Sequence, residues 1–194
     1  ETEMHVSAIA EGQTREIDVG IDGEVDVAER LAISRAHTDG ENQTSYVTNR
    51  TVYQACGGPW GWGNESIEVE GKWIQATPLG RQLQLLESGD LRVVTNDSLT
   101  QEDTLLLVGH PSSDALQEYG VSATQPVFGG PSVKNITMRV LVDNHTHRPI
   151  RSTVSFDISG GGAIGNGTIH TRFGQYNEDV SIVIPDKVKE DAWE

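Results

Sequence analysis

The clearest pattern in the chain is an alternation of apolar and polar positions in its last third. Four stretches show it, at residues 135–143, 150–158, 169–173 and 180–184. Successive side chains of a strand point to opposite faces, so each stretch predicts a strand with one apolar side. The turn-forming run 143–149 joins the first two stretches into a hairpin. Together they predict an antiparallel sheet whose apolar face needs a cover, either protein or ligand.

The rest of the chain repeats this alternation and then interrupts it. Residues 79–88 and 115–119 have the 3.6-residue period of short amphipathic helices. We therefore predict a mainly β protein with a few short helices inserted between two groups of strands. At 194 residues one core is expected, so residues 1–186 are predicted to form a single domain, followed by a polar tail at 187–194. Further strands are expected at 3–11, 17–33, 46–55, 66–76, 91–95 and 104–108.

The charge of the chain narrows the range of partners. The formal net charge is -15, and the basic residues comprise 4 Lys and 10 Arg. Such a surface is typical of a protein that stays hydrated in concentrated salt, so a halophilic source is expected. Nucleic acid and anionic membrane surfaces would both repel it. No run of 18 apolar residues occurs, so membrane attachment would need an anchor outside this chain, and the start at Glu1 suggests a processed N-terminus.

The sequence contains seven Asn-x-Ser/Thr sequons, which are acceptors for N-glycosylation. This number exceeds what random occurrence would give, so we predict an exported, extracellular or cell-surface glycoprotein; the alternative is a polar surface that is never glycosylated. The single cysteine, Cys56, excludes an intrachain disulfide and is expected to be a small buried filler. The candidate glycosylation sites are Asn42, Asn49, Asn64, Asn96, Asn135, Asn144 and Asn166.

The sequence carries none of the common catalytic or cofactor-binding motifs. The sequence has no nucleophile elbow, zinc-protease helix, paired-cysteine pattern or phosphate-binding loop. Asp143, His145 and His147 have metal-like spacing, but a plain polar turn explains them better. Trp60 and Trp62 lie between glycines, which fits either an exposed ligand-binding loop or a plug at one end of the core. We predict no enzyme activity, no cofactor and no metal site.

Four stretches of the sequence have a recognisable pattern. They are the hairpin Y-V-x-N-x-T-V-Y at 46–53, G-K-W at 71–73, V-x-V-D-x-x-T-x-x-P-I-R around Pro149, and the closing pattern T-x-x-T-x-F-x-x-Y-x-x-x-V-x-I-x-I-P at 168–185. In these stretches the chain resembles the LolA/LppX/LprG-like lipoprotein-carrier superfamily, most closely its haloarchaeal secreted lipoproteins. The resemblance implies an antiparallel half-barrel curved around short helices. It also implies a cavity between sheet and helices that holds acyl chains or a lipidated partner.

On this interpretation the protein binds a lipid or another hydrophobic ligand and performs no chemistry. The alternative is a structural or adhesive surface glycoprotein, such as a filament, surface-layer or spike subunit that self-assembles. The ligand, the oligomeric state, and whether a cavity is open or filled by the core are not defined by the sequence. The side chains expected to line the cavity are Leu83, Leu86, Leu116, Tyr119, Ile136, Met138, Val140, Val154, Phe156, Ile169, Phe173, Val180 and Ile182.

Overall fold

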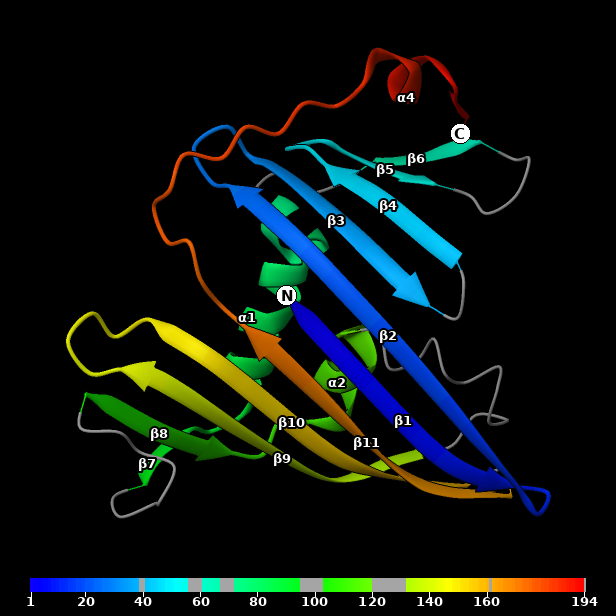
Figure 1. The fold of residues 1–194 in the computed structure, drawn as a ribbon, viewed down its shortest axis with the longest axis vertical. Helices are drawn as coiled ribbons and strands as arrows, with labels where there is room; N and C mark the ends of the chain where they lie inside the picture. Colours follow the sequence, from blue (N-terminus) through cyan, green and yellow to red (C-terminus); the bar gives the residue numbers. More distant parts are fainter. Residues whose placement is uncertain are drawn as a thin grey trace. The chain divides into compact units, whose positions relative to one another are not determined.

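The computed structural model describes residues 1–38, 41–55, 61–66, 72–94, 103–119, 132–160 and 162–193. The protein is mainly β, with antiparallel strands and short helices, which confirms the predicted fold class (Figure 1). The chain divides into two compact units, unit 1 at 1–19 and 83–176, and unit 2 at 20–82 and 177–194. Two of the three boundaries fall inside β2 (Gln13–Asp26) and inside α1 (Pro78–Ser88), and the third follows Tyr176. The prediction of a single domain over 1–186 stays a prediction.

Unit 1 is built on long strands that pair antiparallel, in the order β1-β11-β10-β9-β8-β7. The sheet of this unit is open and does not close into a barrel. Three of its strands form the C-terminal meander that the alternation predicts. The bounds are β1 (Thr2–Ala10), β7 (Arg92–Val94), β8 (Thr104–Gly109), β9 (Ser132–Asp143), β10 (Pro149–Gly160) and β11 (Ala163–Arg172).

The turn between β9 and β10 is organised by Asp143. One carboxylate oxygen of Asp143 accepts the backbone N–H groups of His145 at 3.0 Å and Thr146 at 2.7 Å, and the Thr146 hydroxyl at 2.9 Å. Tyr176 donates its hydroxyl to the Pro149 carbonyl at 2.5 Å, and the Arg148 guanidinium lies 5.1 Å from the centre of its ring. These contacts fix the turn and with it the register of the two strands.

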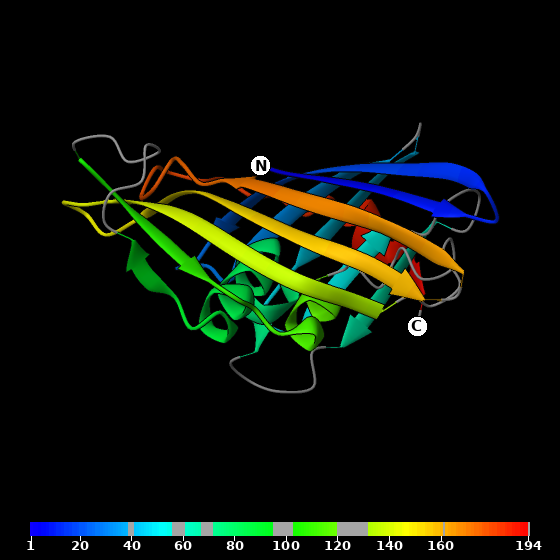
Figure 2. The same cartoon turned by 90° about the horizontal axis from the view of Figure 1, so that it is seen from below.

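The apolar side chains of unit 1 form one cluster on a single face of the sheet, which we call the inner face. Phe156 is the largest fully buried side chain, and its ring lies over Gly167, the residue opposite it on β11. In Figure 2 the green helical turns lie on one side of these strands. Leu85 from the second half of α1 and Leu116 from α2 (Ser113–Tyr119) are fully buried in the cluster. A few side chains of both helices therefore pack on the inner face, in keeping with the predicted fold class.

Unit 2 has shorter strands and two smaller apolar clusters. Its strand order is β12-β6-β5-β4-β3, antiparallel except for the parallel pair β12 and β6. One cluster includes Ile33 and Tyr46. The other is built on Trp73, which lies in a 3-10 helix and not in the strand expected at 66–76. The bounds are β3 (Leu31–Thr38), β4 (Glu41–Val47), β5 (Thr51–Ala55), β6 (Trp62–Ser66), the 3-10 helix η2 (Trp73–Ala76), α4 (Asp186–Glu190) and β12 (Ala192–Trp193).

The end of the chain differs from the sequence prediction. Residues 177–185 form neither helix nor strand, so the expected strand at 180–184 is absent. Ile184 is nevertheless buried, because it packs against the cluster of Ile33 and Tyr46 instead of joining the sheet of unit 1. The predicted polar tail contains α4 and β12, and Val188 is buried in the same cluster. Trp62 packs on Tyr46 with ring centres 5.7 Å apart, whereas Trp60 and Cys56 lie outside the described residues.

Candidate functional site

The structure brings together seven of the residues predicted to line a hydrophobic cavity. All seven belong to the inner-face cluster of unit 1, and none of them is more than 7% exposed. Met138 and Val154 are 0% exposed, so a water-sized sphere cannot touch them. These residues therefore form one apolar face, which is closely packed in this conformation; that it binds a ligand stays a prediction. The seven residues are Leu116, Ile136, Met138, Val140, Val154, Phe156 and Ile169.

The other predicted lining residues lie in different surroundings. Leu86 is partly buried against the inner-face cluster, but Leu83, one turn earlier on α1, is 41% exposed. Phe173 follows β11 and is half-buried outside the cluster. Val180 and Ile182 belong to unit 2, where Ile182 packs against the cluster of Ile33 and Tyr46. The side chain of Tyr119 lies outside the described part of the chain.

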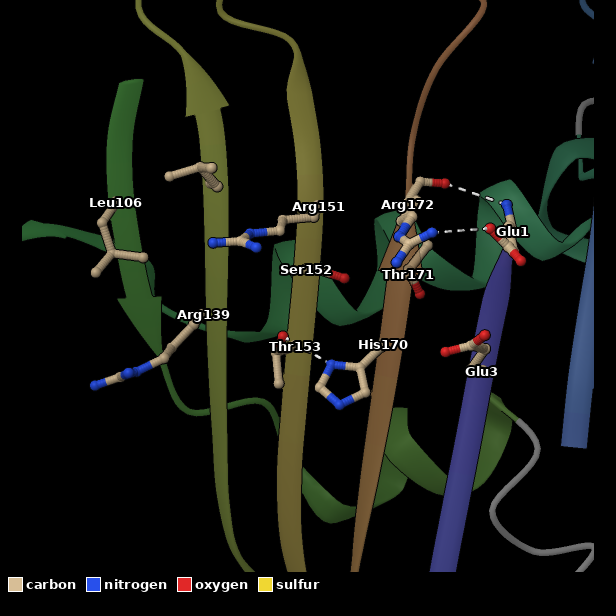
Figure 3. A pocket seen from close by; sticks show the side chains of 11 residues that line it. Glu1, Glu3, Leu106, Arg139, Arg151, Ser152, Thr153, His170, Thr171 and Arg172 are labelled. Atoms are coloured by element: carbon tan, nitrogen blue, oxygen red, sulfur yellow. Dashed lines mark hydrogen bonds and ion pairs between the residues drawn. The ribbon is translucent and has the colours of Figure 1, made fainter. Parts of the chain in front are cut away.

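The opposite side of the same sheet, which we call the outer face, contains a pocket that the sequence did not predict. Its volume is about 450 Å³ (Figure 3). Two neighbouring rows of side chains cross the strands there, as the strand register defines them. The first row is Glu3, His170, Thr153 and Arg139; the second is Glu1, Arg172, Arg151, Leu141 and Leu106, and Ser152 and Thr171 complete the lining.

The two acidic side chains of the pocket, Glu1 and Glu3, lie at the β1 end of these rows. At the β1 end, a carboxylate oxygen of Glu1 lies 3.6 Å from the Arg172 guanidinium, and backbone hydrogen bonds join the same two residues. Nδ1 of His170 lies 3.1 Å from the Thr153 hydroxyl. Figure 3 shows Arg151 extending from β10 across β9 toward Leu106. Among the residues that the structure describes, no ion-pair partner lies within 4.0 Å of Arg151.

The β8 and β9 end of the pocket has an apolar floor. Leu106 and Leu141 occupy opposite positions on these strands, and both point to the outer face. They are only 3% and 9% exposed. These leucines close the base of the pocket and offer almost no surface to a bound molecule. What the pocket offers at this end is the exposed guanidinium of Arg151, and arginine forms paired hydrogen bonds to carboxylate and phosphate.

The sequence did contain a signal for this pocket. Arg139 and Leu141, Arg151 and Thr153, and His170 and Arg172 each occupy successive outward positions, two residues apart, in strands that the alternation identifies. What the sequence did not define was the register that aligns the three pairs. A one-residue change of register would separate them.

Asp143, the first of the three residues with metal-like spacing, stabilises the hairpin turn by accepting hydrogen bonds. The backbone N–H of Thr146, then its hydroxyl, and also the N–H of His145, hold the pKa of Asp143 below its ordinary value of 3.8. Within the described residues no group of three or more His, Cys, Asp or Glu side chains is placed to hold a metal ion. The same part of the chain has no helix long and apolar enough to cross a membrane.

The candidate glycosylation sites are mostly accessible. Asn64 is half-buried, and Asn96 lies outside the described residues. On the outer face of unit 1, Asn135 and Asn166 flank Asp157, and Asn135 donates its side-chain amide to that carboxylate at 2.7 Å. The exposed sequon asparagines are Asn42, Asn49, Asn135, Asn144 and Asn166.

Comparisons with known proteins give only distant likenesses. No protein-family model matches the chain, and no curated protein does. Solved structures similar to it include a DUF1329 family protein from Desulfovibrio piger, with a TM-score of 0.32 and 9% identity over 92% of this chain and 86% of the other. They also include a LolA superfamily protein from Nitrosomonas europaea, with a TM-score of 0.30 and 10% identity over 96% and 87% of the two chains. Likeness at this level carries no conclusion about function.

Proposed function

We propose that the protein is a non-catalytic carrier that binds a hydrophobic ligand on the inner face of unit 1. The observation that carries this proposal is the continuous apolar surface of β1, β9, β10 and β11, to which the described helices contribute few side chains. Only Leu85 and Leu116 are fully buried there, with Leu86 and Ala115 partly so. The resemblance of the sequence to lipoprotein carriers, including its haloarchaeal members, favours the same function.

A ligand would enter by displacing α2, because the inner-face residues are closely packed when the helix is in place. The helix has only seven residues, and a free helix of this length is unstable in water. Exposing Leu116 would cost about 1.5–3 kcal/mol. An acyl chain gains about 0.8 kcal/mol for each methylene that it buries, so a few methylenes offset this cost.

Binding of the uncharged fluorescent dye Nile red to the full chain tests this proposal. We expect saturable binding, and tighter binding to Leu116→Ala, because this substitution lowers the cost of moving α2. Leu83→Ala, on the exposed side of α1, is the matched control and should bind as the native protein does. Circular dichroism would verify that both variants fold. Absence of dye binding by the native protein and by Leu116→Ala would refute the proposal.

We further propose that the protein is exported, acts at the cell surface and carries N-linked glycans. The exposure of five sequon asparagines supports modification, since a glycosylated asparagine needs access to solvent. Intact mass of protein from its own host, before and after enzymatic removal of glycans, measures occupancy. The same spectra under native conditions would detect a co-purified lipid. Assembly without lipid would instead support a structural surface protein.

A further inference from the structure

We propose that an N-linked glycan on Asn166 covers an exposed apolar pair, Ile9 and Ile164, on the outer face of unit 1. The cover rests on the glycosylation proposed above, and it gives the glycan of this one sequon a defined contact with the protein. It does not depend on the proposed carrier function.

The apolar pair is a feature of the sheet that the core does not explain. Ile9 is 56% exposed and Ile164 is 74% exposed. They occupy directly opposite positions on β1 and β11, which lie side by side at this end of the sheet (Figure 1). The Cβ atoms of opposite residues are about 4.5–5.5 Å apart, so the two isoleucines form one apolar surface. A contact that removes this surface from water is favourable.

Asn166 is the next outward residue on β11 after Ile164, and it is exposed. Successive outward residues of a strand are about 6.8 Å apart, so its side chain leaves the same face close to the pair. Across the strands, Asn166 is opposite Ser7, which is the outward neighbour of Ile9. A sugar on Asn166 that leans toward the start of β11 therefore lies above both isoleucines.

The surroundings leave room for such a sugar. The residue opposite Ile164 on β10 is Ser159, whose side chain is small. In the described part of the chain no hydrogen bond holds the side-chain amide of Asn166, so it can turn toward the pair. The amide of Asn135, the other sequon asparagine on this face of the strands, is instead held by Asp157 at 2.7 Å.

Carbohydrate is the occupant that this geometry favours. One face of a sugar ring presents mainly C–H groups, which can bury aliphatic surface while the hydroxyl groups stay in water. Glycosylation joins Nδ2 of Asn166 to C1 of the first sugar; the nitrogen loses a proton and the lipid diphosphate of the sugar donor leaves. The attached glycan is then present beside the pair at high effective concentration. A second copy of the chain would bring a further net charge of -15 to the contact.

The full chain secreted by a host that performs N-glycosylation, compared with the same chain from a host that does not, tests the cover. Glycopeptide mass spectrometry measures the occupancy of Asn166. With isoleucine methyl groups labelled with carbon-13, NMR spectra of the glycoprotein should show nuclear Overhauser contacts from sugar ring protons to Ile9 and Ile164. These contacts are absent if the glycan extends into solvent.

Thr168→Ala removes this sequon and leaves Asn166 unchanged. In the glycoprotein it should lower the midpoint of thermal unfolding by about 2–4 °C more than in the unglycosylated chain, which corresponds to about one buried methylene. Ile164→Ser should abolish this difference. Thr137→Ala, which removes the Asn135 sequon on the same face, is the matched control and should have the same effect in both proteins.

Four results would overturn the cover. An occupied Asn166 without contacts to either isoleucine, or a glycan-dependent effect of Thr137→Ala as large as that of Thr168→Ala, would leave only the proposed glycosylation standing. So would an empty Asn166 in a chain whose other sequons are modified in its own host. A chain without any glycan in its own host would refute the cover and the glycosylation together. A dimer of the glycoprotein that Ile164→Ser dissociates would identify a second copy as the occupant.

Discussion

The two faces of the sheet in unit 1 are made by the same strands, yet they differ in packing and in charge. On the inner face, Met138 and Val154 are inaccessible to solvent. On the outer face, their strand neighbours Arg139 and Thr153 line an open pocket. The alternation that buries one set of side chains therefore displays the other set in rows.

The comparison shows that burial and binding capacity are separable in this sheet. The inner face gains stability from close packing, and a ligand there must compete with the protein's own helices. Apart from the buried Leu106 and Leu141, the outer face contributes little to the core, so its exposed residues can differ from what stability alone would favour. The opposed pair of Arg151 and Arg172 is such a departure, and arrangements that cost stability are common at binding sites.

The largest expected effect comes from disturbing the inner face. Phe156→Ala removes the largest fully buried side chain and should lower the free energy of unfolding by about 3–5 kcal/mol. Urea unfolding followed by hydrogen exchange in β9, β10 and β11 would measure it. Tryptophan fluorescence is unsuitable, because all four tryptophans belong to unit 2.

The matched control for Phe156→Ala is a substitution of the preceding residue, whose side chain lies on the outer face. Ser155→Ala changes an exposed position, so its effect should stay within about 0.5 kcal/mol. Equal effects of the two substitutions would contradict the difference between the faces. A loss of less than about 1 kcal/mol for Phe156→Ala would show that the inner face is loosely packed.

A substitution at Gly167 tests how closely the inner face is packed, because the absence of a side chain there leaves space for the Phe156 ring. A Cβ at this position would lie 2.3 Å from the ring carbon Cζ of Phe156, so Gly167→Ala should cost about 1–3 kcal/mol through overpacking. In the Phe156→Ala background the clash is gone, and the cost should fall toward zero. Gly174→Ala, where no atom lies within 4 Å, is the control. Additive effects would contradict the contact.

The sequence predicted the strands and helices of unit 1 and the composition of both faces, because periods of 2 and 3.6 depend only on local geometry. It failed at residues 180–184, whose alternation resembles a strand although the segment packs against unit 2 without joining a sheet. It also missed the pocket, since Arg139, Arg151 and Arg172 become neighbours only through strand register. Register depends on the turn at 143–149 and on the irregular pairing near Ile150, which no periodicity reveals.

A smaller effect, of opposite sign, is expected on the outer face. Arg151→Gln removes the repulsion with Arg172 and should raise the free energy of unfolding by about 0.2–1 kcal/mol relative to Arg50→Gln, which removes the same charge. The difference should shrink as salt is added, because these side chains are exposed. Urea unfolding at low and high salt would measure it. A lower stability of Arg151→Gln than of Arg50→Gln would contradict a net repulsion between Arg151 and Arg172.

The smallest effect concerns the turn that sets the register of both faces. Because the pKa of Asp143 is lowered by hydrogen bonds from Thr146 and His145, its carboxylate stabilises the folded turn above the unfolded pKa of 3.8. That contribution is lost as the pH falls below 3.8 and through the folded pKa. The amide signal of Thr146 should therefore titrate with a midpoint below 3.8.

Thr146→Ala removes the hydroxyl that bonds to Asp143 and keeps the backbone N–H, so the pKa of Asp143 should move back toward 3.8 in this variant. Asp143→Asn should abolish the titration altogether and increase hydrogen exchange in the turn at neutral pH. It should also perturb Arg139 and Arg151 signals more than those of Met138 and Val154, because the outer face has register but no tight packing to preserve its geometry. Signal changes of equal size on both faces would contradict the expectation that the packing of the inner face preserves its geometry when the turn is disturbed.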